Sequence, residues 1–380
     1  MSTSPLHPLA GQPVHLWLRA ETRADEHRTP LTPSDAAMLI AAGIDITVEQ
    51  SACRVFSDSE YASAGCTLAP TSSWTGAPAY SFILGLKELP ETPDLQHDQI
   101  YFGHAYKGQS GAARLLRRFR DGGGRLLDLE FLRDERSIRL AAFGHWAGYM
   151  GAALGVLQAR ARRFRQRAKG LRAIGPLSTT TKSLLDRDLR DGADGSPPLR
   201  ALVIGAKGRC GRGASAALAT ANVDATLWDV VETTDLDVDA LLAHDLLINT
   251  VGIGGEARPF LIPDDLTRPS RRLDTVVDVT CDLGSPANAL PIYHRLSSWE
   301  RPVQPITCAS HGQTLDLIAI DNLPSLLPRE SSEDFSVQLA PHLLTLADPT
   351  SVWKTSLSYF NRALGELAER PSSKQELDHV

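Results

Sequence analysis

A lysine and a histidine lie at or just past the ends of two short apolar segments in the N-terminal half of the chain. Lys87 and Glu88 follow the apolar segment 80–84, and His104 lies towards the end of the segment 99–106. Lysine and histidine side chains can exchange protons with a reacting amine or with water, so the pair suits acid–base chemistry at a C–N or C–O bond. A single lysine at a strand end is more often solvated than catalytic, and only the joint placement favours catalysis.

More charged residues lie close to predicted strand ends in the same half. Glu130 lies within the expected strand 125–132, and Arg139 within the expected strand 137–143. Arg28 precedes the segment TPLTP, whose prolines restrict the backbone, and it could bind a carboxylate. A solvated loop is the other explanation for Arg28 and its charged neighbours.

The second stretch that could do chemistry is glycine-rich and covers residues 199–229. A short apolar strand is followed by Gly205, Gly208 and Gly211, then by a helix of small residues and a strand that ends at Asp229. Glycines let the backbone approach a pyrophosphate, whose charge is stabilised at the helix N-terminus. An acid about 20 residues after the turn can accept from a ribose 2′-hydroxyl and would repel a 2′-phosphate, which favours NAD over NADP.

The glycine spacing, G-x-x-G-x-x-G, differs from the usual G-x-G-x-x-G, so a strand-to-helix turn that binds no ligand is the alternative. The strand before the turn, the helix after it and the terminal acid together favour a dinucleotide site. Arg209, inside the turn, could pair with a phosphate and weakens the preference for NAD.

Alternating strands and helices must position these residues, and they predict an α/β fold with parallel, doubly wound sheets. We expect two Rossmann-like domains with the active site in the cleft between them. Residues 1–140 and 322–380 form the expected substrate-side domain, and residues 141–321 form the expected NAD-binding domain. A long helix from about residue 144, with small residues on its inner side, is expected to lead the chain from the first domain into the second.

Three further expectations concern the connecting segments. The polar, proline- and glycine-bearing stretch 176–198 is predicted to be a connector. The basic run 160–172 is predicted to be a solvated helix face. Two helices, over 333–346 and 351–368, are expected to end the chain.

The composition is that of a globular enzyme. The 380 residues carry a net charge of −6, which argues against a nucleic-acid surface. No apolar run approaches the roughly 20 residues that span a bilayer, and no secretory signal is visible, so we expect a cytoplasmic protein with no membrane partner. Nothing suggests a metal site. Scattered cysteines without a C-x-x-C pair favour reduced thiols. They are Cys53, Cys66, Cys210, Cys281 and Cys308.

The amino-acid sequence of several stretches resembles that of the NAD-dependent, L-lysine-forming saccharopine dehydrogenases. The stretches are RAET, GLKELPE, FGHAYKGQSG, VVDVT and IDNLPSLLPRESS, and the resemblance extends from about Leu16 to the final helix. Alanine dehydrogenase and the transhydrogenase nucleotide-binding subunit are more distant, because they share the Rossmann-like pair but not these stretches. The resemblance implies oxidative cleavage of saccharopine to L-lysine and 2-oxoglutarate, with NAD as the cofactor.

The resemblance also implies roles for individual residues. Lys87 matches the acceptor of the proton on the substrate amine, and His104 matches the acid–base group that hydrates and collapses the imine. The matching substrate-binding positions are Arg28, Gln109, Arg139 and Phe143. The positions that tune charge or support the site are Glu88, Glu130, Lys107 and Asp321. The cofactor-binding positions are Gly205, Gly208, Arg209, Asp229, Thr233, Ile320, Asp321, Asn322 and Leu323.

The chain departs from the family pattern at a few positions. The cysteine that matches Cys210 is paired in fungal members, but its partner position here is Thr250, so we expect a free thiol at Cys210. Ile138 replaces an arginine on the cofactor side. Two alternatives remain open, namely a related opine or imine dehydrogenase with another amino partner, and a non-catalytic NAD-binding module. We expect small-molecule substrates and a monomer or small homo-oligomer.

Overall fold

The structure is a computed structural model, and it describes residues 14–90, 94–106, 108–109, 111–167, 174–191, 198–252, 258–284, 288–307 and 314–369. The chain divides into two compact units. Unit 1 comprises Met1–Ala142 and Ser332–Val380, and unit 2 comprises Phe143–Ser331. The sequence predicts that the chain enters the second domain at residue 141 and returns to the first at residue 322. The return to unit 1 comes later because Leu323 and Leu326 are buried in the core of unit 2.

Unit 1 is built on a six-stranded parallel sheet in the order β3-β2-β1-β4-β5-β6. The strands are β1 (His15–Leu18), β2 (Asp45–Glu49), β3 (Thr67–Ala69), β4 (Phe82–Leu84), β5 (Asp98–Tyr101) and β6 (Leu126–Asp128). Their short apolar runs suit a sheet that is covered on both faces. The order reverses between β1 and β4, and ligands of such sheets bind beyond the carboxyl ends of the strands at this point.

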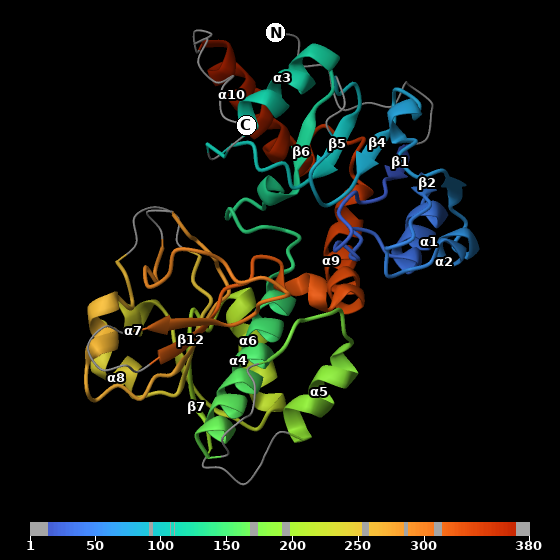
Figure 1. Ribbon diagram of the computed structural model, residues 1–380. Coiled ribbons are helices and arrows are strands. Elements are labelled where there is room, and N and C mark those ends of the chain that lie inside the picture. Colours follow the sequence, from blue (N-terminus) through green and yellow to red (C-terminus); the bar gives the residue numbers. More distant parts are fainter. Residues whose placement is uncertain are drawn as a thin grey trace. The chain divides into compact units, whose positions relative to one another are not determined.

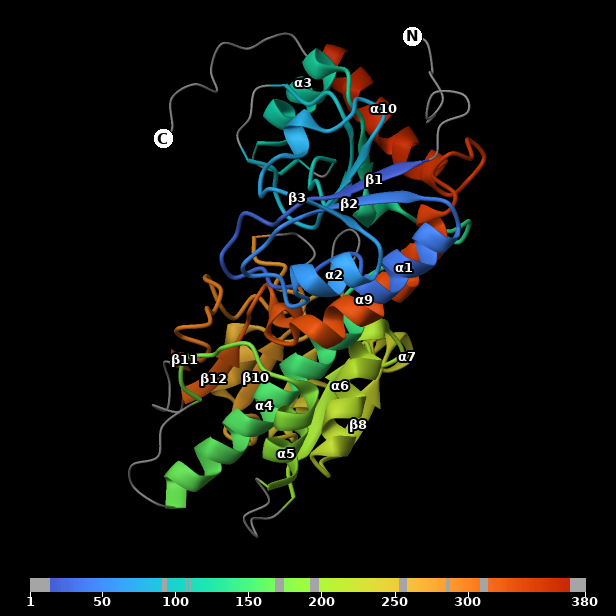
Figure 2. The ribbon, with the colours of Figure 1, turned by 90° about the vertical axis from the view of Figure 1, so that its right-hand side faces the viewer.

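Helices cover both faces of this sheet. Figure 2 shows α1, α2 and α9 on one face and α3 and α10 on the other. The bounds are α1 (Pro33–Ala41), α2 (Asp58–Ser63), α3 (Ala112–Gly122), α9 (Pro328–Leu343) and α10 (Trp353–Glu369). Helix α1 begins where the Thr32 side chain accepts from the Asp35 backbone N–H, with Pro33 at the first helical position. The two predicted C-terminal helices are confirmed as α9 and α10.

Three details of unit 1 differ from the prediction. Residues 137–143 form no strand, because the Asp134 carboxylate accepts from the backbone N–H groups of Arg136 and Ile138 and closes a turn instead. The predicted strand over 125–132 ends at Asp128 and continues as a 3₁₀ helix, Leu129–Phe131. Helix α2 was not predicted, although Ser57 and Glu60 form a capping box that the sequence displays.

Unit 2 is built on a second six-stranded sheet, in the order β11-β12-β10-β9-β7-β8. The strands are β7 (Arg200–Ile204), β8 (Asp224–Trp228), β9 (Leu246–Asn249), β10 (Thr275–Asp278), β11 (Gln304–Thr307) and β12 (Thr314–Ile318). All pairings are parallel except that of the edge strand β11, which runs antiparallel to β12. Strand β12 was not predicted from the sequence.

The long helix α4 (Gly144–Arg167) packs against α6 (Arg209–Thr220), and Figure 1 shows the two helices side by side. A Cβ at Gly148 would lie 1.8 Å from the carbonyl oxygen of Cys210, and one at Gly213 would lie 1.9 Å from that of His145. The small residues on the inner side of α4 therefore allow the backbones to touch, as the sequence predicts.

The stretch 176–198 is not only a connector, because it contains helix α5 (Lys182–Asp191). Leu185 and Leu189, one helical turn apart, are buried in the core of unit 2. Asp186 accepts from the Tyr149 hydroxyl and from the Lys182 ammonium. The polar composition concealed this narrow apolar stripe. The remaining helices of unit 2 are α7 (Val230–Thr234) and α8 (Val238–Leu242).

The basic run at the end of α4 is not a solvated face where the structure describes it. The Arg162 side chain is 15% exposed and lies 3.0 Å from the Asp316 carboxylate. Arg163 lies 2.7 Å from Asp245. These ion pairs join α4 to Asp245, directly before β9, and to Asp316 within β12. The expectation was wrong because the acidic partners are distant in the sequence.

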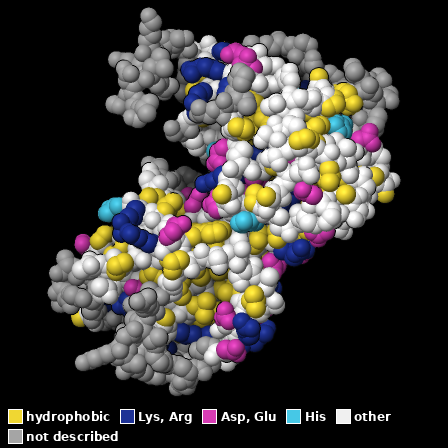
Figure 3. All heavy atoms as spheres, turned by 45° about the vertical axis from the view of Figure 1, so that its right-hand side comes forward, with side chains coloured by type: hydrophobic (Ala, Val, Ile, Leu, Met, Phe, Trp, Pro, Cys, Tyr) yellow, Lys and Arg dark blue, Asp and Glu magenta, His cyan; other side chains and the backbone are white. Residues whose placement is uncertain are grey.

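None of the described helices has the length and apolar character needed to cross a membrane. Positive and negative side chains are interspersed over the face drawn in Figure 3. Cys53, Cys66, Cys210 and Cys281 are free thiols, so the expectation for Cys210 is confirmed. Cys308 lies outside the described residues.

Candidate active site

The carboxyl edge of the sheet in unit 1 brings together side chains from four neighbouring strands. Glu21 follows β1, Lys87 follows β4, His104 follows β5 and Glu130 follows β6. Because these strands are adjacent and parallel, the four residues lie in a row along one edge. Acid–base groups are thus gathered at the position where sheets of this type bind ligands.

Lys87 is half-buried, and its charge acts on a buried carboxylate nearby. Burial would by itself raise the pKa of Glu26, but the guanidinium of Arg28 and then the ammonium of Lys87 outweigh burial and lower it. Arg28 Nε and Nη2 donate to the two carboxylate oxygens of Glu26, at 2.8 and 2.6 Å. Both residues are buried, so the solvated-loop explanation is wrong for them.

His104 stands beside a carboxylate from the neighbouring strand end. Its side chain is 54% exposed, and Nδ1 lies 4.0 Å from Oε2 of Glu130. The residue has a positive φ of 49°, a conformation that few non-glycine residues adopt. Glu130 is 16% exposed, and its backbone N–H donates to Asp128, which fixes the start of the 3₁₀ helix. Glu130 is thus the carboxylate that lies beside His104 at this edge.

The other residues predicted for the substrate side are exposed or half-buried where the structure describes them. Glu88 is exposed and lies 3.9 Å from Nη1 of Arg23. Arg139 is exposed and Gln109 half-buried. Lys107 lies outside the described residues. Phe143 is half-buried and belongs to unit 2, where its carbonyl accepts from the backbone of Ala147.

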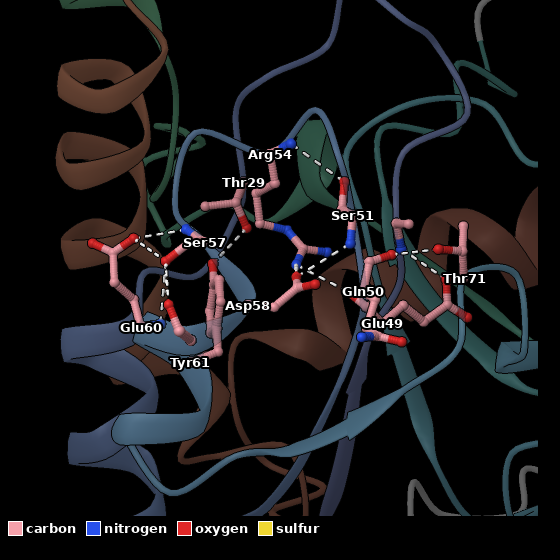
Figure 4. Close-up of polar contacts among 12 residues, drawn as sticks. Thr29, Glu49, Gln50, Ser51, Arg54, Ser57, Asp58, Glu60, Tyr61 and Thr71 are labelled. Carbon is pink, nitrogen blue, oxygen red and sulfur yellow. Dashed lines mark hydrogen bonds and ion pairs between the residues drawn. The ribbon is translucent and has the colours of Figure 1, made fainter.

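Contacts drawn in Figure 4 anchor the loop between β1 and α1 that carries Glu26 and Arg28. The Tyr61 hydroxyl lies 3.3 Å from Thr29 Oγ1, a contact drawn in Figure 4, and it donates to the carbonyl of Leu31 at 2.6 Å. The guanidinium of Arg54 donates to the carbonyl of Glu49 in β2, at 3.0 Å, as Figure 4 shows. It also donates to the carbonyl of Arg19, where the loop begins, at 3.4 Å. On the other side of the loop, the Thr29 backbone N–H donates to Ser332 Oγ in α9. The loop is therefore fixed by its surroundings.

Sequence reasoning missed two residues of this edge, Arg19 and Glu21. Arg19 is 1% exposed, and the Glu21 side chain is 6% exposed. Both contact the backbone of Lys87. Two charged residues directly after a buried apolar strand, in the stretch RAET, were the available signal.

The glycine turn of unit 2 lies at the carboxyl end of β7. Gly205 has a φ of +83°, and a Cβ there would lie 2.8 Å from Thr250 Oγ1. A Cβ at Gly211 would lie 2.2 Å from the carbonyl oxygen of Gly205. These two positions require glycine, the first because of its conformation and the second because of the close approach of α6 to the turn.

The start of α6 fits a dinucleotide pyrophosphate. Gly208 is the N-cap residue and supplies no side-chain hydrogen bond to the first helical turn, and a Cβ there would lie 3.2 Å from the Gly205 oxygen. Arg209 is the first helical residue and is half-buried. A helix start capped by glycine and followed by an arginine can present N–H groups and a positive charge to phosphate oxygens.

Asp229 ends β8 and is hydrogen-bonded to the glycine turn. Its Oδ2 accepts from the backbone N–H of Lys207, at 2.9 Å, and its Oδ1 from that of Val230, at 3.0 Å. The hydrogen bond from Lys207, and then that from Val230, lowers the pKa of Asp229. The carboxylate is therefore ionised at neutral pH and would repel a 2′-phosphate. Thr233 donates from Oγ1 to the Asp229 carbonyl.

The segment 320–323 has mixed surroundings. Ile320 and Leu323 are buried in the core of unit 2, so a ligand could meet only their backbone. Asp321 is exposed. Asn322 accepts from the indole N–H of Trp299 at 3.0 Å, which fixes its side chain.

Comparison with known proteins gives similar relatives over almost the whole chain. The profile of the alanine dehydrogenase/PNT N-terminal domain matches residues 17–150. Saccharopine dehydrogenase [NAD(+), L-lysine-forming] of Emericella nidulans is 39% identical over 93% of this chain and 98% of its own length. The enzyme of the same name from Neurospora crassa is 39% identical over 95% of this chain and 100% of its own.

Among solved structures, an L-alanine dehydrogenase matches with a TM-score of 0.64 at 17% sequence identity. The match covers 93% of this chain and 100% of the other. At this identity the match shows a shared fold, with two Rossmann-like sheets, and no more.

Proposed function

This chain belongs to the family of NAD-dependent, L-lysine-forming saccharopine dehydrogenases, and we propose that it cleaves saccharopine oxidatively to L-lysine and 2-oxoglutarate. One saccharopine, one NAD⁺ and one water yield lysine, 2-oxoglutarate, NADH and a proton. The observation that supports this most is the placement of Lys87 and His104 past adjacent strands of one parallel sheet. A non-catalytic module would need no such pair.

Substrate binding is assigned to Arg28, Gln109, Arg139 and Phe143. Saccharopine has three carboxylates, and a guanidinium binds a carboxylate best when its plane is fixed. Glu26 fixes the plane of Arg28, because both of its oxygens accept from that guanidinium. Arg139 is exposed, so its guanidinium is accessible to an incoming substrate.

Proton transfer is assigned to Lys87 and His104. The secondary amine of saccharopine must lose its proton before the adjacent carbon is oxidised, and Lys87 accepts that proton. NAD, when bound, supplies the acceptor of the hydride. His104 then takes a proton from the water that attacks the imine carbon and returns a proton to the departing lysine nitrogen. Glu130 stabilises the protonated imidazole between these steps.

The groups around the base balance its charge. Glu88 and Glu130 offset the positive charge of Lys87, Lys107 and the substrate-binding arginines, and Asp321 supports the cofactor side. NAD is assigned to the glycine turn and the end of β8, through Gly205, Gly208, Arg209, Asp229 and Thr233. The backbone of the segment 320–323 completes that set. We place the enzyme in the cytoplasm as a monomer or small homo-oligomer.

Steady-state assays of NADH formation test the proposal. Purified protein is mixed with NAD⁺ and, in separate reactions, saccharopine, other opines or alanine. We expect kcat/KM for saccharopine to exceed that for every other substrate, with lysine and NADH released in equal amounts. A higher kcat/KM for another opine would favour the alternative of a different amino partner. NAD binding without NADH formation from any of them would favour a non-catalytic module.

A further inference from the structure

Two charged residues with enclosed side chains hold the backbone segment that carries Lys87, and we propose that Arg19 and Glu21 act as a pair that positions this lysine for proton transfer. The inference rests on the proposed role of Lys87 as the base. Neither residue needs to touch the substrate, so both are positioning residues. Their effect on the reaction should pass entirely through Lys87.

The Arg19–Glu21 pair bonds to the backbone of the turn after β4. Glu21 Oε1 accepts from the backbone N–H of Leu86 at 2.7 Å, and Oε2 accepts from that of Lys87 at 3.0 Å. Arg19 donates through Nη2 to the carbonyl oxygen of Lys87 and through Nη1 to Glu21, at 3.3 Å. The backbone donor and the backbone acceptor of Lys87 are thus both engaged by one ion pair.

The same turn is also held from the other side. The backbone N–H of Phe102, directly after β5, donates to the carbonyl of Leu86 at 3.3 Å. Strands β1 and β5 both flank β4, so the segment before Lys87 is fixed between its two neighbours. The side chain of Lys87 therefore starts from a backbone position with little freedom.

Stability alone does not explain a pair buried this deeply. Arg19 is 1% exposed and the Glu21 side chain 6% exposed. Removing two charges from water is unfavourable, and well-packed apolar residues often stabilise a fold at least as much as a buried ion pair. What apolar residues could not do is bond to the N–H and C=O groups of Lys87. We therefore infer that the pair serves to fix the backbone position of Lys87.

The surroundings leave space for the Arg19 guanidinium. A Cβ on Gly85 would lie 2.4 Å from Arg19 Nε, so a larger residue there would force the guanidinium to move. The guanidinium also lies 5.8 Å from the ring centre of Tyr101. Arg54, which is shown in Figure 4, donates to the backbone carbonyl of Arg19 at 3.4 Å. Gly85 is thus part of the arrangement, and its substitution should reproduce the loss of the pair.

The main test compares Glu21→Gln with the control Arg125→Met. The control breaks an ion pair with Asp98 at the amino end of β5, in the same unit but at the opposite edge of the sheet. A misplacement of about 1 Å can reduce a rate by about 100-fold. We therefore expect Glu21→Gln to lower kcat for saccharopine by about 10- to 100-fold, with the KM for NAD unchanged. The control should stay within about twofold of the parent. A parental kcat in Glu21→Gln would overturn the proposal.

The double variant separates positioning from a general structural effect. In the Lys87→Met background, Glu21→Gln should cause no further loss of kcat, because the group that it positions is gone. An equal loss in both backgrounds would show that Glu21 acts independently of Lys87 and would overturn the inference. Parental turnover in Lys87→Met alone would overturn the proposed role of the base and this inference with it. Lost turnover in Lys87→Met with parental turnover in Glu21→Gln would overturn only the inference.

Gly85→Ala provides a variant that leaves both charges in place. The added methyl group should displace the Arg19 guanidinium and lower kcat as Glu21→Gln does. Gly76→Ala is the control, because no atom lies within 4 Å of its added Cβ. The melting temperature of each variant shows that the fold is retained. A Gly85→Ala variant with parental kcat and a parental pH–rate profile would contradict the proposed positioning.

Discussion

The carboxyl edges of the two sheets are built from different kinds of groups. In unit 1 the edge consists of charged side chains, some of them in buried ion pairs such as Glu26–Arg28. In unit 2 the described part of the edge at β7 is mainly backbone, with a glycine turn tied to the carboxylate of Asp229. The buried arginines of unit 2, Arg162 and Arg163, lie at the opposite edge and hold α4.

This difference corresponds to the two tasks that the proposed reaction sets. Proton transfer needs side chains held in fixed positions, and buried ion pairs can supply fixed positions at an energetic cost. A pyrophosphate needs backbone N–H groups that it can approach closely, and any side chain there would obstruct it. The edge in unit 1 should therefore be sensitive to changes of charge, and the edge in unit 2 to added volume.

The largest effect is expected from the double variant Lys87→Met/His104→Gln. Loss of acid–base groups commonly reduces turnover by about 10²- to 10⁴-fold, so kcat for saccharopine should fall by at least that much. Saccharopine binding should be retained, as measured by calorimetry. Lys354→Met, an exposed lysine of α10, is the control. Parental turnover in the double variant would remove both residues from the mechanism.

Added volume in unit 2 should have the next largest effect. In Gly211→Ala the new methyl group would overlap the Gly205 carbonyl, and overpacking of this kind costs about 1–3 kcal/mol. We expect a lower urea midpoint of unfolding and weaker NAD binding. Gly175→Ala is the control, since nothing lies within 4 Å of its Cβ. Unchanged NAD affinity in Gly211→Ala would show that the turn is not the phosphate site.

A smaller effect is expected from Asp229→Ser, which removes the charge at the end of β8. Hydrogen bonds to charged groups contribute about 1.5–3 kcal/mol, so kcat/KM for NAD should fall about tenfold or more. The value for NADP should rise relative to that for NAD, because repulsion of the 2′-phosphate is lost. Asp224→Ser, at the exposed start of the same strand, is the control. An unaltered ratio of the two values would contradict the assigned role of Asp229.

The smallest effect concerns the acid stability of unit 2. Burial would raise the pKa of Asp245, but hydrogen bonds from Arg272, the Arg200 backbone and Arg163 outweigh burial and lower it. Its carboxylate therefore stabilises the fold above the ordinary pKa of 3.8, and this contribution is lost as the pH falls through the lowered value. Melting temperatures below about pH 4 should fall less steeply in Asp245→Asn than in the parent or in the control Asp188→Asn. An equally steep fall of the melting temperature in Asp245→Asn and in the parent would contradict the stabilising role of the Asp245 carboxylate.

The sequence predicts the architecture well because strands, glycine turns and caps are local signals. The buried core of each sheet appears as short apolar runs, and Gly205 and Gly211 mark the turn by their spacing. Lys87 and His104 could be singled out because each lies past such a run. Helix α5 was missed because only Leu185 and Leu189 reveal its apolar stripe among polar residues.

The ion pairs could not be predicted, because a charged residue reveals neither its burial nor its partner. Glu21 bonds to Leu86, and Arg162 pairs with Asp316, across long separations in the chain. Glu26 and Arg28 are close in sequence, but their burial depends on the strand ends and helix α9 around them. The partners and the burial of the charged residues were therefore the least predictable part of the site.

Chemical rescue of Lys87→Ala tests the central claim most directly, because it asks whether an amine at this position removes the proton from the substrate. Turnover of saccharopine by the variant is measured with increasing concentrations of small primary amines. We expect very low activity without amine and a saturable increase with it, greater for more basic amines of equal size. Turnover at the parental rate without any amine would contradict the assignment of Lys87 as the base.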